Sequence, residues 1–133
     1  MRNDKSKHSP DGTLKQGLVT EYFKNGAPSS AGEYSNGEKA GVWNYYLLNG
    51  LVKATGSYSG GRMIGPWQWY RENGKLMQTG AFDDEKRTGI WKRYHPNGAL
   101  YDEGEYADDK KIGEWNTYDA NGKRIKTTRH KLQ

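Results

Sequence analysis

Cysteine is absent from the chain, which excludes disulfide bridges and thiolate metal ligands. Long apolar runs are absent as well, so the sequence contains no candidate membrane-spanning helix and no signal-type hydrophobic stretch near Met1. A cytoplasmic location is therefore the default expectation. A periplasmic or surface location would require that a signal peptide had been removed.

Aliphatic side chains are scarce, and hydrophobic residues of every kind reach only 32% of the chain. Such a composition indicates disorder when the net charge is high, but here the net charge is only +5. Five Trp, ten Tyr and two Phe supply the missing apolar surface, since each ring can bury roughly 150–250 Å². Glycines, which number 18, are unfavourable in helices by about 1 kcal/mol each and suit turns and bulges. The composition predicts a folded chain with an aromatic core and many turns.

Acidic residues are absent after Gly122, where five basic residues follow. These are Lys123, Arg124, Lys126, Arg129 and Lys131. They account for the whole net charge, because the other 16 basic residues balance 16 acidic ones. We expect a solvated, partly frayed terminus here; contact with nucleic acid, anionic lipid or an acidic partner is the alternative.

Several residue types recur every 24 positions, which indicates a repeat architecture. The first column is Gly17, Gly41, Gly65, Gly89 and Gly113, and two positions later come Val19, Trp43, Trp67, Trp91 and Trp115. The sixth position is Tyr22, Tyr46, Tyr70, Tyr94 and Tyr118, followed by Asn-Gly pairs at 25–26, 49–50, 73–74, 97–98 and 121–122. A further glycine recurs at Gly32, Gly56, Gly80 and Gly104, two residues before Tyr34, Tyr58, Phe82 and Tyr106.

Each repeat has the pattern of a β-hairpin, because Asn-Gly between two β-prone aromatic runs is a strong hairpin signal. A two-residue turn would place Trp43 opposite Gly56, with each ring covering a glycine across the ladder. The sequence Pro96-Asn97-Gly98 instead suits a three-residue loop, which would turn the Trp column to the other face. We favour the three-residue loop at Pro96 and leave the other loops open; a bulge would reconcile the two registers.

The predicted fold is all-β: a single-layer antiparallel meander of tandem 24-residue β-hairpin repeats, elongated and twisted or curved. We expect an N-terminal tail and turn over residues 1–12 and a basic tail over 128–133. Between them, residues 13–127 form the repeat array, with units beginning at 17, 41, 65, 89 and 113. A half-unit opens the array, since Asp11-Gly12 echoes the Asn-Gly turns, and residues 123–126 close it.

The unit Gly-x-Trp-x-x-Tyr-x-x-Asn-Gly-x-Leu-x-x-x-Gly-x-Tyr resembles the MORN-repeat variant family. Residues 65–82 and 89–106 carry it most clearly, and the resemblance covers Gly17 to Gly122. It implies an elongated sheet of hairpins that acts as a scaffold. Bacterial relatives imply an antitoxin role of the YwqK type, and eukaryotic ones imply phospholipid binding and protein docking. The first unit departs from the pattern, since Val19 replaces Trp, and we interpret that unit as a cap.

Residues suited to catalysis do not form a recognisable set. His8, His95 and His130 lie far apart in the sequence, and no recurring Ser or Cys accompanies them. Acidic clusters at 83–85, 102–105 and 108–109 fall mostly in predicted turns, where Asp stabilises the local backbone. Their spacing is not that of a calcium loop. We therefore expect no enzymatic activity, no cofactor and no metal.

Basic residues recur beside every second predicted turn, and stacking would bring them into a row along one edge of the sheet. They are Lys39, Arg62, Arg87, Lys110 and Lys111, with Lys86 beside Arg87. Such a row could bind lipid or other phosphates. Lysine on edges also prevents aggregation between sheets, which is the simpler explanation. We do not expect nucleic-acid binding, because the aromatic columns are needed as core.

The fifth position of the repeat breaks the pattern, and it carries Tyr45, Trp69 and Arg93 in three successive units. Exposed aromatics beside an arginine have the composition of a protein-binding hot spot. The alternative is that the rings fill the interior of a curved sheet. From these residues we expect a non-enzymatic protein-binding scaffold, and the resemblance to MORN variants implies an antitoxin- or immunity-like role for it. A phospholipid-binding module is the second hypothesis.

Replacing a central Trp should cost much more stability than replacing a residue of the capping unit, because each central unit packs against two neighbours. We expect Trp67→Ala to lower the free energy of unfolding by about 3–5 kcal/mol and Val19→Ala to lower it far less. Chemical denaturation of both variants measures the difference. Equal unfolding midpoints would contradict a capping role for the first unit.

Overall fold

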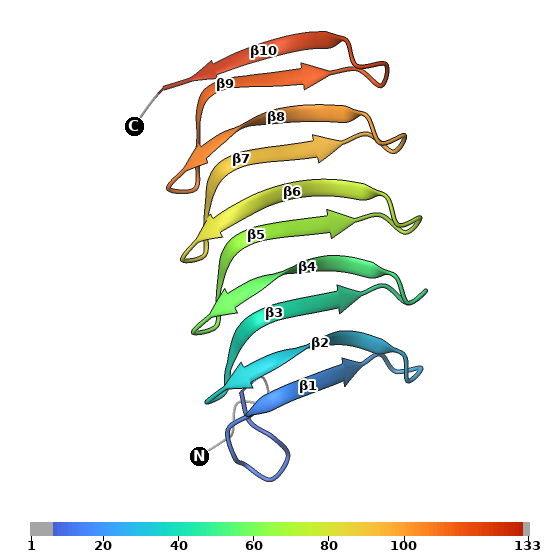
Figure 1. Cartoon of the computed structure of the whole chain (residues 1–133), viewed down its shortest axis with the longest axis vertical. Helices are drawn as coiled ribbons and strands as arrows, with labels where there is room; N and C mark the ends of the chain where they lie inside the picture. Colours follow the sequence, from blue (N-terminus) through green and yellow to red (C-terminus); the bar gives the residue numbers. More distant parts are fainter. Residues whose placement is uncertain (1–6, 132–133) are drawn as a thin grey trace.

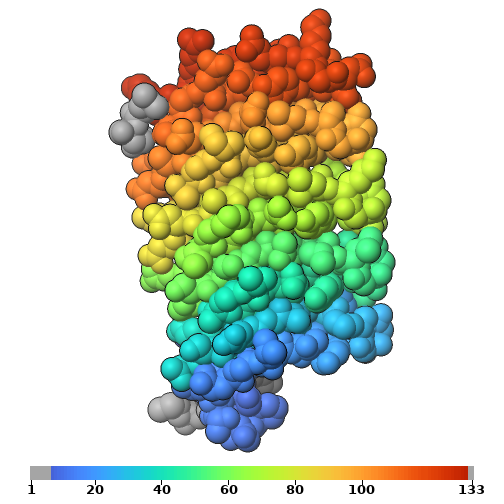
Figure 2. Space-filling view, in the orientation of Figure 1, coloured from blue at the N-terminus to red at the C-terminus, as the bar shows by residue number. Residues whose placement is uncertain are grey.

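The structure, a computed structural model, describes residues 7–131 and shows one ten-stranded antiparallel sheet in which neighbours in sequence are neighbours in space. Its strands are β1 (Gly17–Tyr22), β2 (Pro28–Ser35), β3 (Glu38–Tyr46), β4 (Val52–Ser59), β5 (Arg62–Tyr70), β6 (Leu76–Asp83), β7 (Lys86–Tyr94), β8 (Leu100–Ala107), β9 (Lys110–Tyr118) and β10 (Arg124–His130). The hairpins stack along the long axis, from β1 at one end to β10 at the other (Figure 1; Figure 2). The predicted single-layer meander is confirmed. No helix in the described part of the chain could span a membrane.

The Asn-Gly turns are three-residue loops, as predicted at Pro96. His95 N donates to Ala99 O at 2.7 Å, Gly98 N donates to His95 O at 2.9 Å, and Gly98 has a φ of 92°. The Asn97 side chain accepts from Ala99 N at 2.9 Å, which stabilises the turn locally. The loops at Gly26, Gly50, Gly74 and Gly122 close with the same backbone bonds.

A bulge next to each of these loops reconciles the two registers that the sequence left open. Tyr45 pairs with Ala54 but Tyr46 pairs with Val52, so one residue of β4 is left over. The extra residue brings Trp43 opposite Gly56 despite the three-residue loop. The Trp column and the fifth position therefore share one face, which we call the aromatic face, and the sixth-position tyrosines lie on the opposite face.

Each central Trp ring lies on a glycine, but not on the one that it opposes across its own hairpin. The Trp43 ring covers Gly32 of the preceding unit, where an added Cβ would lie 2.2 Å from the ring. The Trp43 indole N–H donates to Glu33 O at 2.9 Å, which fixes the ring in that position. Trp67, Trp91 and Trp115 cover Gly56, Gly80 and Gly104 in the same way. The expectation that each ring shields its opposing glycine is corrected: the contact joins successive units.

The turns at the other edge contain two residues, both with positive φ. They are Asn36-Gly37, Gly60-Gly61, Asp84-Glu85 and Asp108-Asp109. Glu85 is strained there, with a φ of 77°, but its N–H donates to Met63 O at 2.9 Å and its carboxylate accepts from Met63 N at 2.6 Å. These bonds reach one unit back along the array, so the turns at this edge also link neighbouring units.

The expectation of a frayed C-terminal tail is wrong for residues 124–130, which form a strand. Strand β10 pairs with β9 as far as His130, which opposes Gly113, so the boundary expected at residue 127 falls inside a strand. Backbone pairing holds the segment in place, since most of its side chains are exposed. At the other end of the sheet, His8 and Leu14 form an isolated antiparallel β-bridge. The loop between them closes with the same backbone hydrogen bonds as the Asn-Gly loops. Residues 1–6 and 132–133, parts of the two expected tails, lie outside the described residues.

A methyl group under an indole should destabilise the sheet. We expect Gly80→Ala to cost about 1–3 kcal/mol or more, because its Cβ would lie 2.2 Å from the Trp91 ring. Thr128→Ala, at the same repeat position in β10, is the matched control and should cost much less. Combining Gly80→Ala with Trp91→Val should cost less than the sum of the two single changes. Additive effects in urea denaturation would contradict the contact.

Candidate partner-binding face

The three residues expected to bind a partner, Tyr45, Trp69 and Arg93, lie in one continuous row across the aromatic face. Cross-strand pairing connects the row through all ten strands, and we call it the cross-strand row. Its members in order are Glu21, Ser30, Tyr45, Ala54, Trp69, Gln78, Arg93, Asp102, Thr117 and Lys126. The three predicted residues all come from odd-numbered strands. The structure thus brings the predicted residues together on one surface.

Tyr45 is half-buried and takes part in the packing of the sheet. Its ring lies 6.2 Å from that of Trp43 and 6.4 Å from that of Trp67, measured between centroids. Its hydroxyl lies 2.6 Å from the Tyr58 hydroxyl and accepts from Lys39 Nζ at 2.9 Å. Burial raises the pKa of Tyr45. The ring therefore serves the core as well as the surface, as the alternative interpretation of this position required.

Trp69 is also half-buried, but its polar edge is unused. Its ring stacks 6.0 Å from Trp67 and lies 5.5 Å from Trp91. The indoles of the four central Trp residues donate to backbone carbonyls. The Trp69 N–H has no acceptor among residues 7–131. This indole therefore keeps a donor available for a ligand.

Arg93 carries an exposed charge in a fixed orientation. Its side chain is 52% exposed, whereas that of its partner Asp102 is 9% exposed. Nε donates to one carboxylate oxygen at 3.1 Å and Nη2 donates to the other at 2.6 Å. The hydrogen bond to Asp102 raises the pKa of the guanidinium, which also lies 5.0 Å from the Tyr101 ring. Nη1 forms no hydrogen bond within the described residues, so Arg93 presents a preorganised donor.

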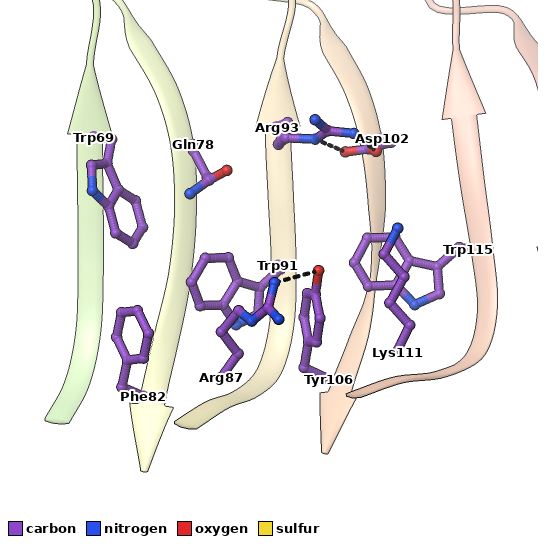
Figure 3. A pocket seen from close by; sticks show the side chains of 10 residues that line it. All are labelled: Trp69, Gln78, Phe82, Arg87, Trp91, Arg93, Asp102, Tyr106, Lys111 and Trp115. Atoms are coloured by element: carbon purple, nitrogen blue, oxygen red, sulfur yellow. Dashed lines mark hydrogen bonds and ion pairs between the residues drawn. The ribbon is translucent and has the colours of Figure 1, made fainter. Parts of the chain in front are cut away.

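Trp69 and Arg93 border a hollow of about 410 Å³ on the aromatic face (Figure 3). Its lining residues are Trp69, Gln78, Phe82, Arg87, Trp91, Arg93, Asp102, Tyr106, Lys111 and Trp115. The Gln78 amide has no hydrogen-bond partner in the part of the chain that the structure describes. Lys111 Nζ lies 4.6 Å from the Trp115 ring centroid and pairs with no described carboxylate. The hollow therefore combines an aromatic floor with unused polar groups and an excess of positive charge.

The predicted basic row does not form an unbroken line of free cations. Lys39, Arg87 and Lys111 point onto rings of the aromatic face, opposite Tyr34, Phe82 and Tyr106. Arg62 and Lys110 occupy the adjacent position, beside the two-residue turns. Acidic residues of the next unit neutralise three of the cations: Arg62 meets Asp84 at 2.9 Å, Lys86 meets Asp108 at 3.1 Å, and Arg87 meets Asp109 at 2.5 Å. Sequence spacing missed these pairs because they join residues of successive repeats.

Metal-binding groups do not occur among the described residues, in which no three His, Cys, Asp or Glu side chains gather. His95 Nε2 lies 2.8 Å from Tyr118 O, a contact that links two successive Asn-Gly loops. Arg71 makes an equivalent link to Tyr94 O at 2.8 Å. Both side chains are therefore engaged in joining neighbouring repeats.

Comparison with known proteins identifies two of the repeats. Residues 63–84 and 87–108 match the MORN repeat variant family. No curated protein matches the chain. Solved structures that resemble it include TarM, with 15% sequence identity and a TM-score of 0.45 over 75% of this chain and 20% of that one. An S. aureus TarM mutant in complex with fondaparinux, alpha-GlcNAc-glycerol and UDP is 14% identical, with a TM-score of 0.46 over 75% of this chain and 21% of that one. The chain spans about a fifth of the length of these structures.

Alkaline pH should destabilise the aromatic face. Burial and the nearby Glu21 carboxylate raise the pKa of Tyr34 to about 12, and burial also raises that of Tyr58. Because the folded state holds both phenols neutral, their contribution is complete below the ordinary pKa of about 10. It is lost as pH rises from there towards about 12. Urea denaturation across this range should show falling stability, and Tyr34→Phe should weaken the dependence. An unchanged pH dependence in that variant would contradict the assignment.

Proposed function

We propose that this chain is a non-enzymatic protein-binding scaffold whose aromatic face contacts its partner. The observation that carries the proposal is the hollow bordered by Trp69 and Arg93, where rings and unused hydrogen-bonding groups lie side by side. Interface hot spots are enriched in Trp, Tyr and Arg, which combine apolar area with directional donors. Rigid strands hold these side chains, so little conformational freedom is lost when a partner binds.

The charged groups of the hollow suit binding better than acid–base chemistry. Asp102 is engaged by Arg93 through both oxygens, and Arg87 is held by Asp109 and by the Tyr106 hydroxyl. A general base needs a free site within hydrogen-bond reach of a substrate proton. The hollow suits a partner surface that carries carboxylates. Lys111 Nζ and Arg93 Nη1 line it, and neither pairs with a carboxylate among the described residues.

An antitoxin-like role is the finer proposal within this function. It rests on the resemblance of the repeats to MORN variants, which two units support directly. Phospholipid binding receives less support, because Arg62, Lys86 and Arg87 already have carboxylate partners. A membrane surface would have to compete with those carboxylates for each of the three cations.

Affinity capture with the immobilised chain tests the proposal. Trp69→Ala should weaken binding of the captured partner by about 2 kcal/mol, roughly thirtyfold, and should cost more in affinity than in thermal stability. Arg93→Gln should weaken it as well. Ile90→Ala is the matched control, since Ile90 is 56% exposed and lies on the opposite face of β7. A partner lost with Ile90→Ala but retained by both other variants would move the binding surface to the opposite face.

A further inference from the structure

The large residues of the cross-strand row repeat at a distance that matches one kind of polypeptide. Tyr45, Trp69 and Arg93 lie two strands apart from one another, which is about 9.4–9.8 Å per step. A polyproline II helix has three residues per turn and rises about 3.1 Å per residue, so its side chains repeat on one side every ~9.3 Å. An extended strand repeats every ~6.8 Å. Two turns of an α-helix rise ~10.8 Å.

One hollow opens along the row, beside Gln78 between Trp69 and Arg93. Between Tyr45 and Trp69 the surface is filled, since Ala54 is only 6% exposed. The Trp67 ring lies there, 6.4 Å from the Tyr45 ring and 6.0 Å from the Trp69 ring. A polyproline II helix laid along the row would place one residue in the hollow and the residue three positions away over these rings. Proline suits both places, since grooves lined by aromatic rings bind proline-rich segments in this conformation.

The hydrogen-bonding groups of the row also suit this occupant. A polyproline II helix has no internal hydrogen bonds, so its carbonyl groups are available as acceptors. The Trp69 N–H, on the side of the ring that faces away from Gln78 (Figure 3), and the Gln78 amide are both unused. Both groups can therefore bind backbone carbonyls of a ligand without giving up a bond within the sheet.

The positive charge beside the row favours acidic side chains next to the prolines of the ligand. Beyond Trp69, the row presents Arg93 Nη1, and the adjacent hollow presents Lys111 without a carboxylate partner among the described residues. We propose that the cross-strand row binds a proline-rich segment in the polyproline II conformation, with prolines three residues apart and an acidic residue next to them. This inference rests on the proposed protein-binding function and names the class of partner.

Fluorescence anisotropy with three labelled synthetic peptides of equal length tests the inference. The first has proline at every third position and glutamate among the other residues. The second has the same composition, with the prolines moved so that no two are three residues apart. The third has lysine in place of glutamate. We expect the first peptide to bind at least tenfold more tightly than either of the others.

Variants of the chain connect the binding to the row. Trp69→Phe keeps the ring and removes only the N–H, and it should weaken binding of the first peptide at least threefold. Arg93→Gln should reduce the preference for glutamate over lysine, and Ile90→Ala should leave every affinity unchanged. Circular dichroism confirms that each variant is folded. If Trp69→Ala lowers stability too far, Trp69→Phe and Arg93→Gln decide the matter.

Equal affinity for the first two peptides would overturn the inference, and so would the absence of saturable binding or indifference to Trp69→Phe. Its failure is distinguishable from failure of the proposed function. If a captured protein depends on Trp69 while the peptides do not bind, the protein-binding face stands and the polyproline II ligand is rejected. If the first peptide depends on Trp69 while the captured protein does not, the row is a peptide site and that protein binds elsewhere.

Discussion

The sheet depends on the contact between an indole ring and a bare glycine in the preceding unit. A single layer has no second sheet to cover its core, so the burial must come from rings lying flat on the backbone of a neighbouring hairpin. Trp43 achieves this so completely that none of its surface is exposed, with Gly32 beneath it and Tyr34 against its edge at 5.1 Å. The indole N–H then ties the ring to the neighbouring strand. Packing and hydrogen bonding therefore join the same pair of units, which is why the array holds together without a conventional aliphatic core.

Much of this architecture could be predicted because the repeat consists of residue types that favour few local structures. The Asn-Gly pairs predicted the loops, and the alternation of aromatic residues predicted the strands. Which strand a Trp ring leans towards could not be predicted, because pairing places Trp43 opposite Gly56 while the ring covers Gly32. Register describes the backbone, whereas the direction of a long side chain depends on local twist and on irregular pairing. One such irregularity lies at Gly41, where Ala31 pairs with Asn44 but Glu33 pairs with Ala40.

The candidate site was predictable in position but not in detail. Departures from the repeat identified Tyr45, Trp69 and Arg93, and sheet pairing places them in one row. Nothing in the sequence indicated that Asp102 would orient Arg93, or that Asp84 would neutralise Arg62. These partners lie on different strands or in different repeats, and their meeting depends on the stacking of the units. The basic residues in the sequence therefore suggested more positive charge at the edge with the two-residue turns than the structure has there. The hollow on the aromatic face does have an excess of positive charge.

The contact between indole and glycine also gives the array a polarity that bears on self-association. An incoming unit contributes the indole, and the unit that receives it contributes the glycine. At the receiving position of β10 stands Thr128, opposite Trp115, and at the donating position of β1 stands Val19. A second copy stacked head-to-tail, with its β1 along β10, would bring a valine to a threonine, and neither half of the contact would form. The outermost strands thus discourage open-ended polymerisation by shape, and the basic side chains of β10 add mutual repulsion when two such edges meet.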